Sequence, residues 1–263
     1  MIGILIDVTR CTGCQRCVDA CVSANQLGDD APLPQHAPDG LSAQRWSSIV
    51  QPAAGHYVRK QCRHCLEPAC VSVCPAGAMH KTPEGPVIYD SSVCLGCRYC
   101  MMACPFGIPR YEWDSAAPLV RKCTLCYERL KQGQLPACVE ACPEGALLFG
   151  TRGDLLTEAH RRLQAQPSRY LPTVYGEHEV GGTSVLYVSD VSLDFLGFQG
   201  APGQTPLPDL TWDWLVKVPP VGWGVMALMA GTYWIIKRRM KLAARQAGAE
   251  AQTPEQADDG GHE

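Results

Sequence analysis

The feature that most constrains this chain is a cysteine run of the form C-x2-C-x2-C-x3-C-P, made by Cys94, Cys97, Cys100, Cys104 and Pro105. Three thiolates spaced two residues apart on a tight loop can bind three irons of one [4Fe–4S] cubane. The fourth thiolate, before the proline, ligates a different cubane, so a partner run is expected. That partner lies directly upstream, within residues 62–75.

All 16 cysteines of the 263-residue chain fall into four runs of four, with none left over; each begins with C-x2-C and ends with C-x3-C, and the middle spacing varies. The runs are Cys11, Cys14, Cys17, Cys21; Cys62, Cys65, Cys70, Cys74; Cys94, Cys97, Cys100, Cys104; and Cys123, Cys126, Cys138, Cys142. Disulfides are one alternative, but cysteine at roughly 6% is below the level of disulfide-stabilised secreted domains. Zinc is another, since two C-x2-C pairs can bind it, but zinc does not explain the recurrent x3 spacing. The runs therefore predict four [4Fe–4S] clusters.

The composition favours a fold that bound cofactors help to stabilise. The chain has 25 Gly and 21 Pro but only 4 Phe, so its conventional apolar core is expected to be small. Cofactors ligated by side chains can supply the missing stability. The net charge of -3 offers no basic excess for phosphates, so no nucleic-acid partner is expected.

We predict an α+β, loop-rich fold in which two interlocked ferredoxin-like lobes fill residues 1–200. Residues 60–110 carry the two middle cysteine runs and form one lobe. This lobe is inserted within the other, which is assembled from residues 1–59 and 111–150. One four-cluster domain is thus expected rather than two separable ones.

Local patterns predict several elements in this domain. Strands are expected at residues 3–8, 86–89 and 183–188, and helices at residues 18–25 and 155–166, the last with Asp154 as its N-cap. Residues 28–55 are predicted to make a long surface excursion with a strand near residues 45–50. That excursion is either a solvated loop or a contact with a neighbouring subunit.

Residues 218–236 are the sustained apolar stretch of the chain and carry no charge. As a helix they cover roughly 28 Å, enough to cross the hydrocarbon core of a bilayer, although a buried helix is the alternative. Residues 201–217 are predicted to be a linker, and residues 237–263 a tail that is basic at first, then acidic and disordered.

Basic residues directly after the apolar stretch predict its orientation: Lys237, Arg238, Arg239, Lys241 and Arg245. Such residues favour the cytoplasmic side, so the chain is expected to cross the inner membrane once, with its C-terminus in the cytoplasm and the cluster domain in the periplasm. No secretory signal is recognised before the first cysteine run. We therefore expect the domain to be exported already folded, with a partner that carries the export signal.

With its runs placed, the chain resembles the four-cluster iron–sulfur (beta) subunits of the dimethyl sulfoxide reductase superfamily. Among these it is similar to the formate dehydrogenase N beta subunit and to the hydrogenase-2-type iron–sulfur subunit. The resemblance covers about residues 4–200 and extends beyond the cysteines to Ile108-Pro-Arg110, Lys122-Cys-Thr-Leu-Cys126 and residues 175–187. Residues 175–187 look more like the hydrogenase-linked type, whereas the C-terminal apolar stretch looks more like the formate dehydrogenase type.

The resemblance also implies which cysteines hold which cluster. Cluster 1, nearest the catalytic subunit, takes Cys11, Cys14, Cys17 and Cys142; cluster 2 takes Cys21, Cys123, Cys126 and Cys138. Cluster 3 takes Cys62, Cys65, Cys70 and Cys104, and cluster 4, nearest the membrane, takes Cys74, Cys94, Cys97 and Cys100. Some relatives lack the cysteine that matches Cys97 and carry a three-iron cluster, so all four are expected to be cubanes here.

By the same resemblance, the protein is a non-catalytic electron-transfer subunit of a respiratory oxidoreductase complex. Its expected partners are a catalytic subunit outside the membrane, an integral membrane subunit that binds quinone or haem, and membrane lipid. A zinc-stabilised, membrane-anchored interaction module is the alternative. Cations in or beside the runs either tune the clusters or are ordinary surface charges: Arg16, Arg63, Arg98, Arg121 and Lys122. His64, inside the second run, either forms a hydrogen bond with a cluster or has a plain packing or surface role.

Overall fold

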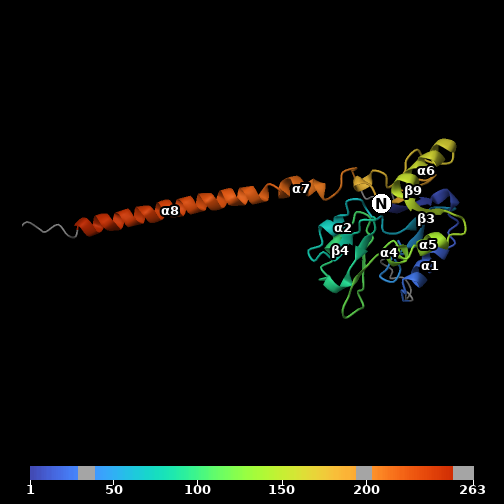
Figure 1. Cartoon of the computed structure of the whole chain (residues 1–263), viewed down its shortest axis with the longest axis horizontal. Helices are drawn as coiled ribbons and strands as arrows, with labels where there is room; N and C mark the ends of the chain where they lie inside the picture. The colour runs from blue at the N-terminus through green and yellow to red at the C-terminus, as the bar shows by residue number, and fades with distance from the viewer. Residues whose placement is uncertain (29–38, 194–202, 251–263) are drawn as a thin grey trace, which may run out of the picture. The chain divides into compact units, whose positions relative to one another are not determined.

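The computed structural model describes residues 1–28, 39–193 and 203–250, with side chains up to residue 246. It divides into two compact units, residues 1–210 and residues 211–263. The first unit holds every cysteine and extends ten residues beyond the predicted domain boundary at residue 200. Its helices and strands are short and are joined by long connections (Figure 1).

A three-stranded sheet lies at the centre of the first unit. Strand β1 (Ile2–Asp7) lies between β8 (Leu147–Thr151), which is antiparallel to it, and β9 (Val185–Val188), which is parallel. Successive side chains of a strand point to opposite faces. Ile4 and Ile6 therefore pack into one apolar cluster and Leu5 into another. The strands predicted at residues 3–8 and 183–188 are confirmed, with their ends shifted by one or two residues.

Helix α6 (Arg152–Ala165) covers the Leu5 face of this sheet. Leu155, Ala159 and Leu163 recur every four residues, so they form one helical stripe against the sheet. The predicted N-cap was wrong. Thr151 is the N-cap, because its extended backbone lets its hydroxyl accept from the Asp154 N–H, and Asp154 lies in the first turn, where a carboxylate is favourable.

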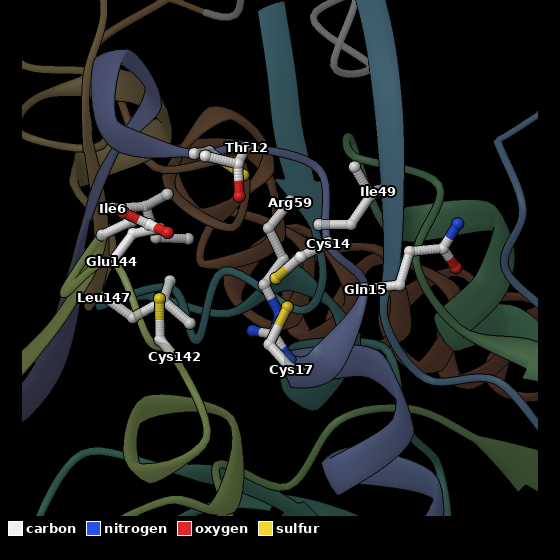
Figure 2. Close-up of a pocket in the computed structure, with 12 residues that line it drawn as sticks. Ile6, Thr12, Cys14, Gln15, Cys17, Ile49, Arg59, Cys142, Glu144 and Leu147 are labelled. Atoms are coloured by element: carbon white, nitrogen blue, oxygen red, sulfur yellow. The ribbon is translucent and has the colours of Figure 1, made fainter.

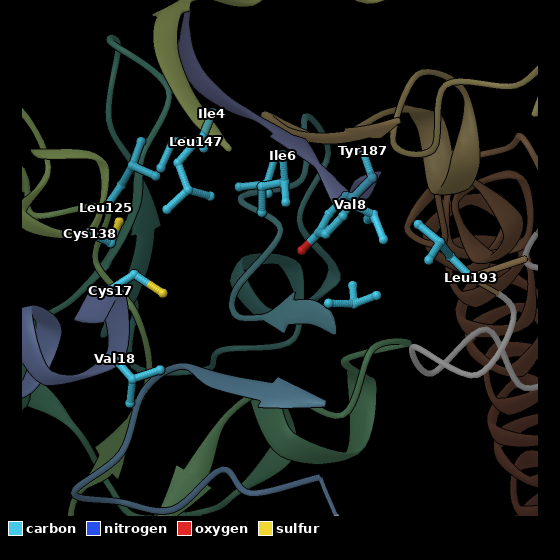
Figure 3. Close-up of a cluster of buried hydrophobic side chains, with 12 residues drawn as sticks. Ile4, Ile6, Val8, Cys17, Val18, Leu125, Cys138, Leu147, Tyr187 and Leu193 are labelled. Atoms are coloured by element: carbon cyan, nitrogen blue, oxygen red, sulfur yellow. The ribbon is translucent and has the colours of Figure 1, made fainter. Parts of the chain in front are cut away.

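The opposite face of the sheet leads into the cysteine runs. Helices α1 (Arg16–Ala24) and α5 (Ala137–Glu140) lie side by side below it (Figure 1). Cys17 and Cys138 extend from these helices into the same apolar cluster as Ile4 and Ile6 (Figure 3). Potential metal ligands are therefore part of the core on this side.

Short hairpins and single helical turns carry the remaining runs. The hairpins pair β2 (Ser48–Ala53) with β3 (His56–Lys60), β4 (Met79–Lys81) with β5 (Val87–Tyr89), and β6 (Arg110–Tyr111) with β7 (Val120–Arg121). The short helices are α2 (Ala69–Ser72), α3 (Tyr99–Ala103) and α4 (Tyr127–Lys131), and 3-10 turns cover Val8–Arg10, Ser91–Val93 and Glu179–Gly181. The strand predicted at residues 45–50 starts at Ser48. Part of the predicted surface excursion, residues 29–38, lies outside the described residues.

The C-terminal part contains α7 (Asp209–Leu215) and α8 (Val218–Glu250). Helix α7 lies within the predicted linker, which is therefore not wholly irregular. Helix α8 continues beyond residue 236 through the basic segment to Glu250, because this segment is rich in Lys, Arg, Ala and Gln, all good helix formers. Among the described residues, one helical segment, residues 209–246, is long and apolar enough to cross a membrane, with a mean hydropathy of 1.2.

A buried ion pair fixes the end of β1. The Asp7 carboxylate is 1% exposed and accepts hydrogen bonds from Arg162 Nη1 at 2.7 Å and from the Tyr170 hydroxyl at 2.9 Å. It also accepts from the hydroxyl and N–H of Thr9, in the turn that leads to Cys11. Asp7 thus joins helix α6, the central sheet and the entry to the first cysteine run.

Arg162→Met is expected to destabilise the first unit by about 3 kcal/mol, because it removes the hydrogen-bonded cation of the buried Asp7 carboxylate and leaves only the half-exposed Arg10, whose Nε lies 3.9 Å away. For a domain of this size, this corresponds to a fall of about 6–12 °C in the unfolding midpoint, measurable by loss of near-ultraviolet circular dichroism. Arg161→Met is the matched control, because the neighbouring Arg161 is exposed and pairs with Glu158 instead. Equal midpoints for the two variants would contradict this role of Asp7.

Candidate metal centres

The backbone of the cysteine runs directs N–H groups at sulfur. Cys94 Sγ accepts from the Gly96 N–H and Cys123 Sγ from the Leu125 N–H, each at 3.4 Å. Gly96 and Leu125 have positive φ angles of 67° and 57°. Left-handed residues in such loops turn consecutive N–H groups to one side and form a concave site for an anion. The runs are therefore shaped to stabilise negatively charged sulfur.

The first run shows why such a position can require glycine. Gly13 has a φ of 73°, and its N–H lies close enough to Cys11 to lower the pKa of that thiol, against the larger rise caused by burial. A Cβ on Gly13 would lie 2.5 Å from the Tyr57 ring. Glycine is thus needed for its backbone conformation and for the close approach of this ring.

The first cavity is lined by Cys11, Cys14, Cys17 and Cys142. Its other walls include the apolar side chains Ile6, Ile49 and Leu147, together with Arg59. Arg59 reaches toward Cys14 and Cys17, and Cys142 faces them across the cavity (Figure 2). The cavity has about 410 Å³ of space not filled by protein atoms, part of it open to solvent. Three cysteines of one run and one from a distant run thus meet.

Two further cavities have the same construction. The second, with about 300 Å³ of unfilled space, is lined by Cys21, Cys123, Cys126 and Cys138. Another, with about 330 Å³, is lined by Cys74, Cys94, Cys97 and Cys100. In each, three cysteines belong to one run and one comes from another. These are the groupings that the resemblance implied for clusters 2 and 4.

The remaining set consists of Cys62, Cys65, Cys70 and Cys104. Burial raises the pKa of the Cys65 thiol well above its ordinary value, and the charges of Cys62, Cys104 and Cys70 raise it further. The structure therefore brings three predicted groups together around cavities, and the remaining one is a partly buried set of neighbouring thiols whose burial and charges raise the pKa of Cys65 and Cys70.

The donor chemistry of these sets fits iron–sulfur clusters. Soft thiolate ligands favour iron–sulfur clusters, and each set supplies four. Burial raises the pKa of Cys21 to about 11, of Cys70 to about 12 and of Cys100 to about 11, so without a metal these thiols stay protonated at neutral pH. Metal binding must release those protons. No three Cys, His, Asp or Glu among the described residues converge tightly enough for one single ion, and the thiols line wider spaces instead.

The four sets lie in series through the first unit. Arg59 lines the first and the second cavity. Cys123 of the second set and Cys62 of the third belong to one apolar cluster with Phe106. Cys70 of the third set interacts electrostatically with Cys100 of the fourth, where α2 packs on α3. Neighbouring sets are thus in contact, as a relay of electrons requires.

The cations singled out in the sequence have different surroundings. Arg16 is exposed, and Arg121 pairs with Glu112 at 2.6 Å. Arg98 is exposed and stacks on Tyr111 and Trp113. Arg63 and Lys122 are buried, and Lys122 Nζ donates to the carbonyls of Val87 and Cys123. Of these five cations, the last two can act on the interior.

His64 is fully buried between Arg63 and Cys65. Its Nδ1 accepts from the Val87 N–H at 2.9 Å, and burial, followed by the charges of Lys122 and Lys81, lowers the pKa of His64 well below its usual range. The ring is therefore neutral and fixes strand β5. Of the roles expected for His64, a surface position is excluded by its burial, and Nδ1 is occupied by the Val87 N–H.

Sequence reasoning missed Arg59. It lies on β3, three residues before Cys62 and outside every run, and is 2% exposed. Burial alone would lower the pKa of Arg59, but nearby thiolates, led by Cys138 and Cys17, raise it above its ordinary value. The sequence feature that could have identified Arg59 is its position as a cation on a strand that leads directly into a cysteine run.

Comparison with known proteins agrees with these centres. Residues 53–152 match a 4Fe-4S dicluster domain family, and residues 10–79 match a second family of the same description. The hydrogenase-2 operon protein HybA of Escherichia coli O157:H7 is 38% identical over 74% of this chain and 72% of its own length. One subunit of the anaerobic dimethyl sulfoxide reductase of Escherichia coli K12 is 41% identical over 58% of this chain and 75% of its own length.

This protein belongs to the iron–sulfur subunits of the dimethyl sulfoxide reductase family. As a member of this family, it is an iron–sulfur electron-transfer subunit of an oxidoreductase complex and binds [4Fe–4S] clusters. A protein of Nitratidesulfovibrio vulgaris is 44% identical over 93% of this chain and 69% of its own length, so similarity to known proteins also extends into the C-terminal unit.

Cys21→Ser tests the exchange of ligands between runs. It is expected to change the spectrum of the cluster held by Cys123, Cys126 and Cys138, because Cys21 lines that cavity and not the one its own run supplies. Electron paramagnetic resonance of the reduced protein measures this. Cys17→Ser is the matched control from the same helix and should change the first cluster instead. The same signal altered in both variants would contradict the exchange.

Proposed function

We propose that this subunit holds four [4Fe–4S] clusters and relays electrons between a periplasmic catalytic subunit and a membrane subunit that binds quinone or haem. The observation that carries the proposal is the grouping of the thiols, in which three cavities each combine three cysteines of one run with one from another. When bound, the clusters supply one-electron transfer. The protein contributes ligands, burial and hydrogen bonds to sulfur.

The proposed ligand sets are those given in the sequence analysis. The first and second sets tie the N-terminal run to residues 123–142, whereas the third and fourth are complete within residues 62–104. This arrangement supports two interlocked ferredoxin-like lobes, the second inserted in the first. The order of contacts between the sets supports a linear path, and the family resemblance supports the first set as its catalytic end and the fourth as its membrane end.

The surface beside the fourth set favours a protein contact there. Leu95 is 74% and Met102 87% exposed, and Tyr99 is also exposed. Large exposed apolar side chains in one region mark interaction sites.

The catalytic partner, in the proposal, is formate dehydrogenase-like or hydrogenase-like. The similarity to the hydrogenase-2 operon protein HybA over 74% of this chain supports a hydrogenase-like partner.

Cluster content tests the proposed function directly. Anaerobically purified protein is expected to contain about 16 iron atoms and about 16 acid-labile sulfides per chain, because 16 thiolates supply four cubanes. The sample should be brown, with broad visible absorption. Stoichiometric zinc in a colourless sample would instead support the zinc-stabilised interaction module, and a three-iron signal in anaerobic material would contradict four cubanes.

Protease accessibility tests the proposed topology. With residues 218–236 in the membrane and the following basic residues in the cytoplasm, protease added to spheroplasts should digest the cluster domain and leave a short C-terminal fragment protected. In lysed spheroplasts the fragment should lose its cytoplasmic tail. A protected cluster domain together with a digested tail in intact spheroplasts would show that the orientation is inverted.

A further inference from the structure

Arg59 lies between two of the cysteine cavities. Its side chain lines the first with Cys17 and the second with Cys21, Cys123 and Cys138. Strand pairing with Ile49 and a hydrogen bond of 2.9 Å from the Tyr187 hydroxyl to the Arg59 carbonyl hold its backbone in place. The backbone of Arg59 is therefore held in place, and its side chain extends to both the first and the second cavity.

The polar atoms of Arg59 are not satisfied by the described part of the protein. The residue is 2% exposed, yet Nε and Nη1 have no hydrogen-bond partner there. The neighbouring Lys60 points to the other face of β3 and pairs with Asp39 at 2.8 Å. An arginine that is buried and unpaired is costly, because its charge loses the solvation of water. The buried charge of Arg59 thus requires an anion in the cavities that its side chain lines.

The nearest candidate anions are the thiolates themselves and the sulfur-rich groups that they bind. Cys17 lines the first cavity together with Arg59. Arginine presents five N–H donors in a planar fork, so one side chain can donate in two directions. A cation beside a cluster favours the form with the extra electron and therefore raises the reduction potential, as do hydrogen bonds to sulfur.

We propose that Arg59 is a shared cation of the first and second clusters, donating to sulfur on two sides and raising the reduction potentials of this pair relative to the third and fourth. The proposal rests on the ligand sets of the proposed function. It identifies Arg59 as a tuning and positioning residue, because it binds no iron. It also makes the first two clusters respond together to a single change in the protein.

Redox titration of the purified complex, followed by electron paramagnetic resonance, tests this role. In Arg59→Met, the ratio of reduced to oxidised cluster at the wild-type midpoint should fall about tenfold for the first and the second cluster, a shift of about 59 mV for a one-electron couple. The third and fourth clusters should keep their midpoints. Signals are assigned with Cys14→Ser for the first cluster and Cys126→Ser for the second. Arg161→Met is the surface control.

If the Arg59→Met protein does not accumulate, Arg59→Lys tests whether Arg59 raises the potentials of the first two clusters. Lysine keeps the charge but has one compact ammonium in place of the wide planar fork of five donors, so it is not expected to match the hydrogen bonds of Arg59 to both cavities. At least one of the first two midpoints should therefore fall while the third and fourth stay. Full iron content with all four midpoints unchanged would overturn the proposal, as would an equal shift of all four. Low iron in the wild-type complex would instead reject the ligand sets themselves.

Discussion

The structure depends on the burial of a polar segment at its centre. Residues 59–64, Arg-Lys-Gln-Cys-Arg-His, are all at most 9% exposed. Buried cations and amides destabilise a fold unless they are compensated. Lys60 pairs with Asp39 and His64 accepts from a backbone N–H, but the guanidinium nitrogens of Arg63 have no hydrogen-bond partner among the described residues and stack on Tyr187 and Phe106 instead. Negatively charged, sulfur-rich clusters next to this segment would compensate the buried positive charges that the polypeptide leaves without hydrogen-bond partners.

This constraint explains how a chain with so few aromatic residues forms a defined domain. Conventional packing is concentrated around β1, with Leu5 and α6 on one face and Ile4 and Ile6 on the other. Elsewhere the elements are single turns and short hairpins around two smaller apolar clusters, both of which include cysteines. The cysteine sets join those pieces across the sequence. Cofactor binding and folding are therefore one equilibrium over most of the domain.

The fold and the site differ in how far the sequence predicts them. Ligand spacing and hydrophobic patterns are local, so the four runs, two of the three central strands and the apolar helix could be recognised directly, whereas β8 was not predicted. The cap of α6 was misplaced because Thr151 and Asp154 are both good capping residues, and only the backbone angles at Thr151 separate them. Arg59 was missed because its role arises from tertiary contacts with Cys138 and Cys17, which no local pattern contains.

The pairing of distant runs has a consequence for synthesis of the protein. In the proposed ligand scheme, the third and fourth sets are complete once residue 104 has left the ribosome. The first set waits for Cys142, although its other three ligands are the earliest cysteines made. A nascent chain would thus expose Cys11, Cys14 and Cys17 to oxygen and stray metals while residues 18–142 are being made. In this scheme the N-terminal run waits longest for its last ligand, so it would gain most from a chaperone during biogenesis.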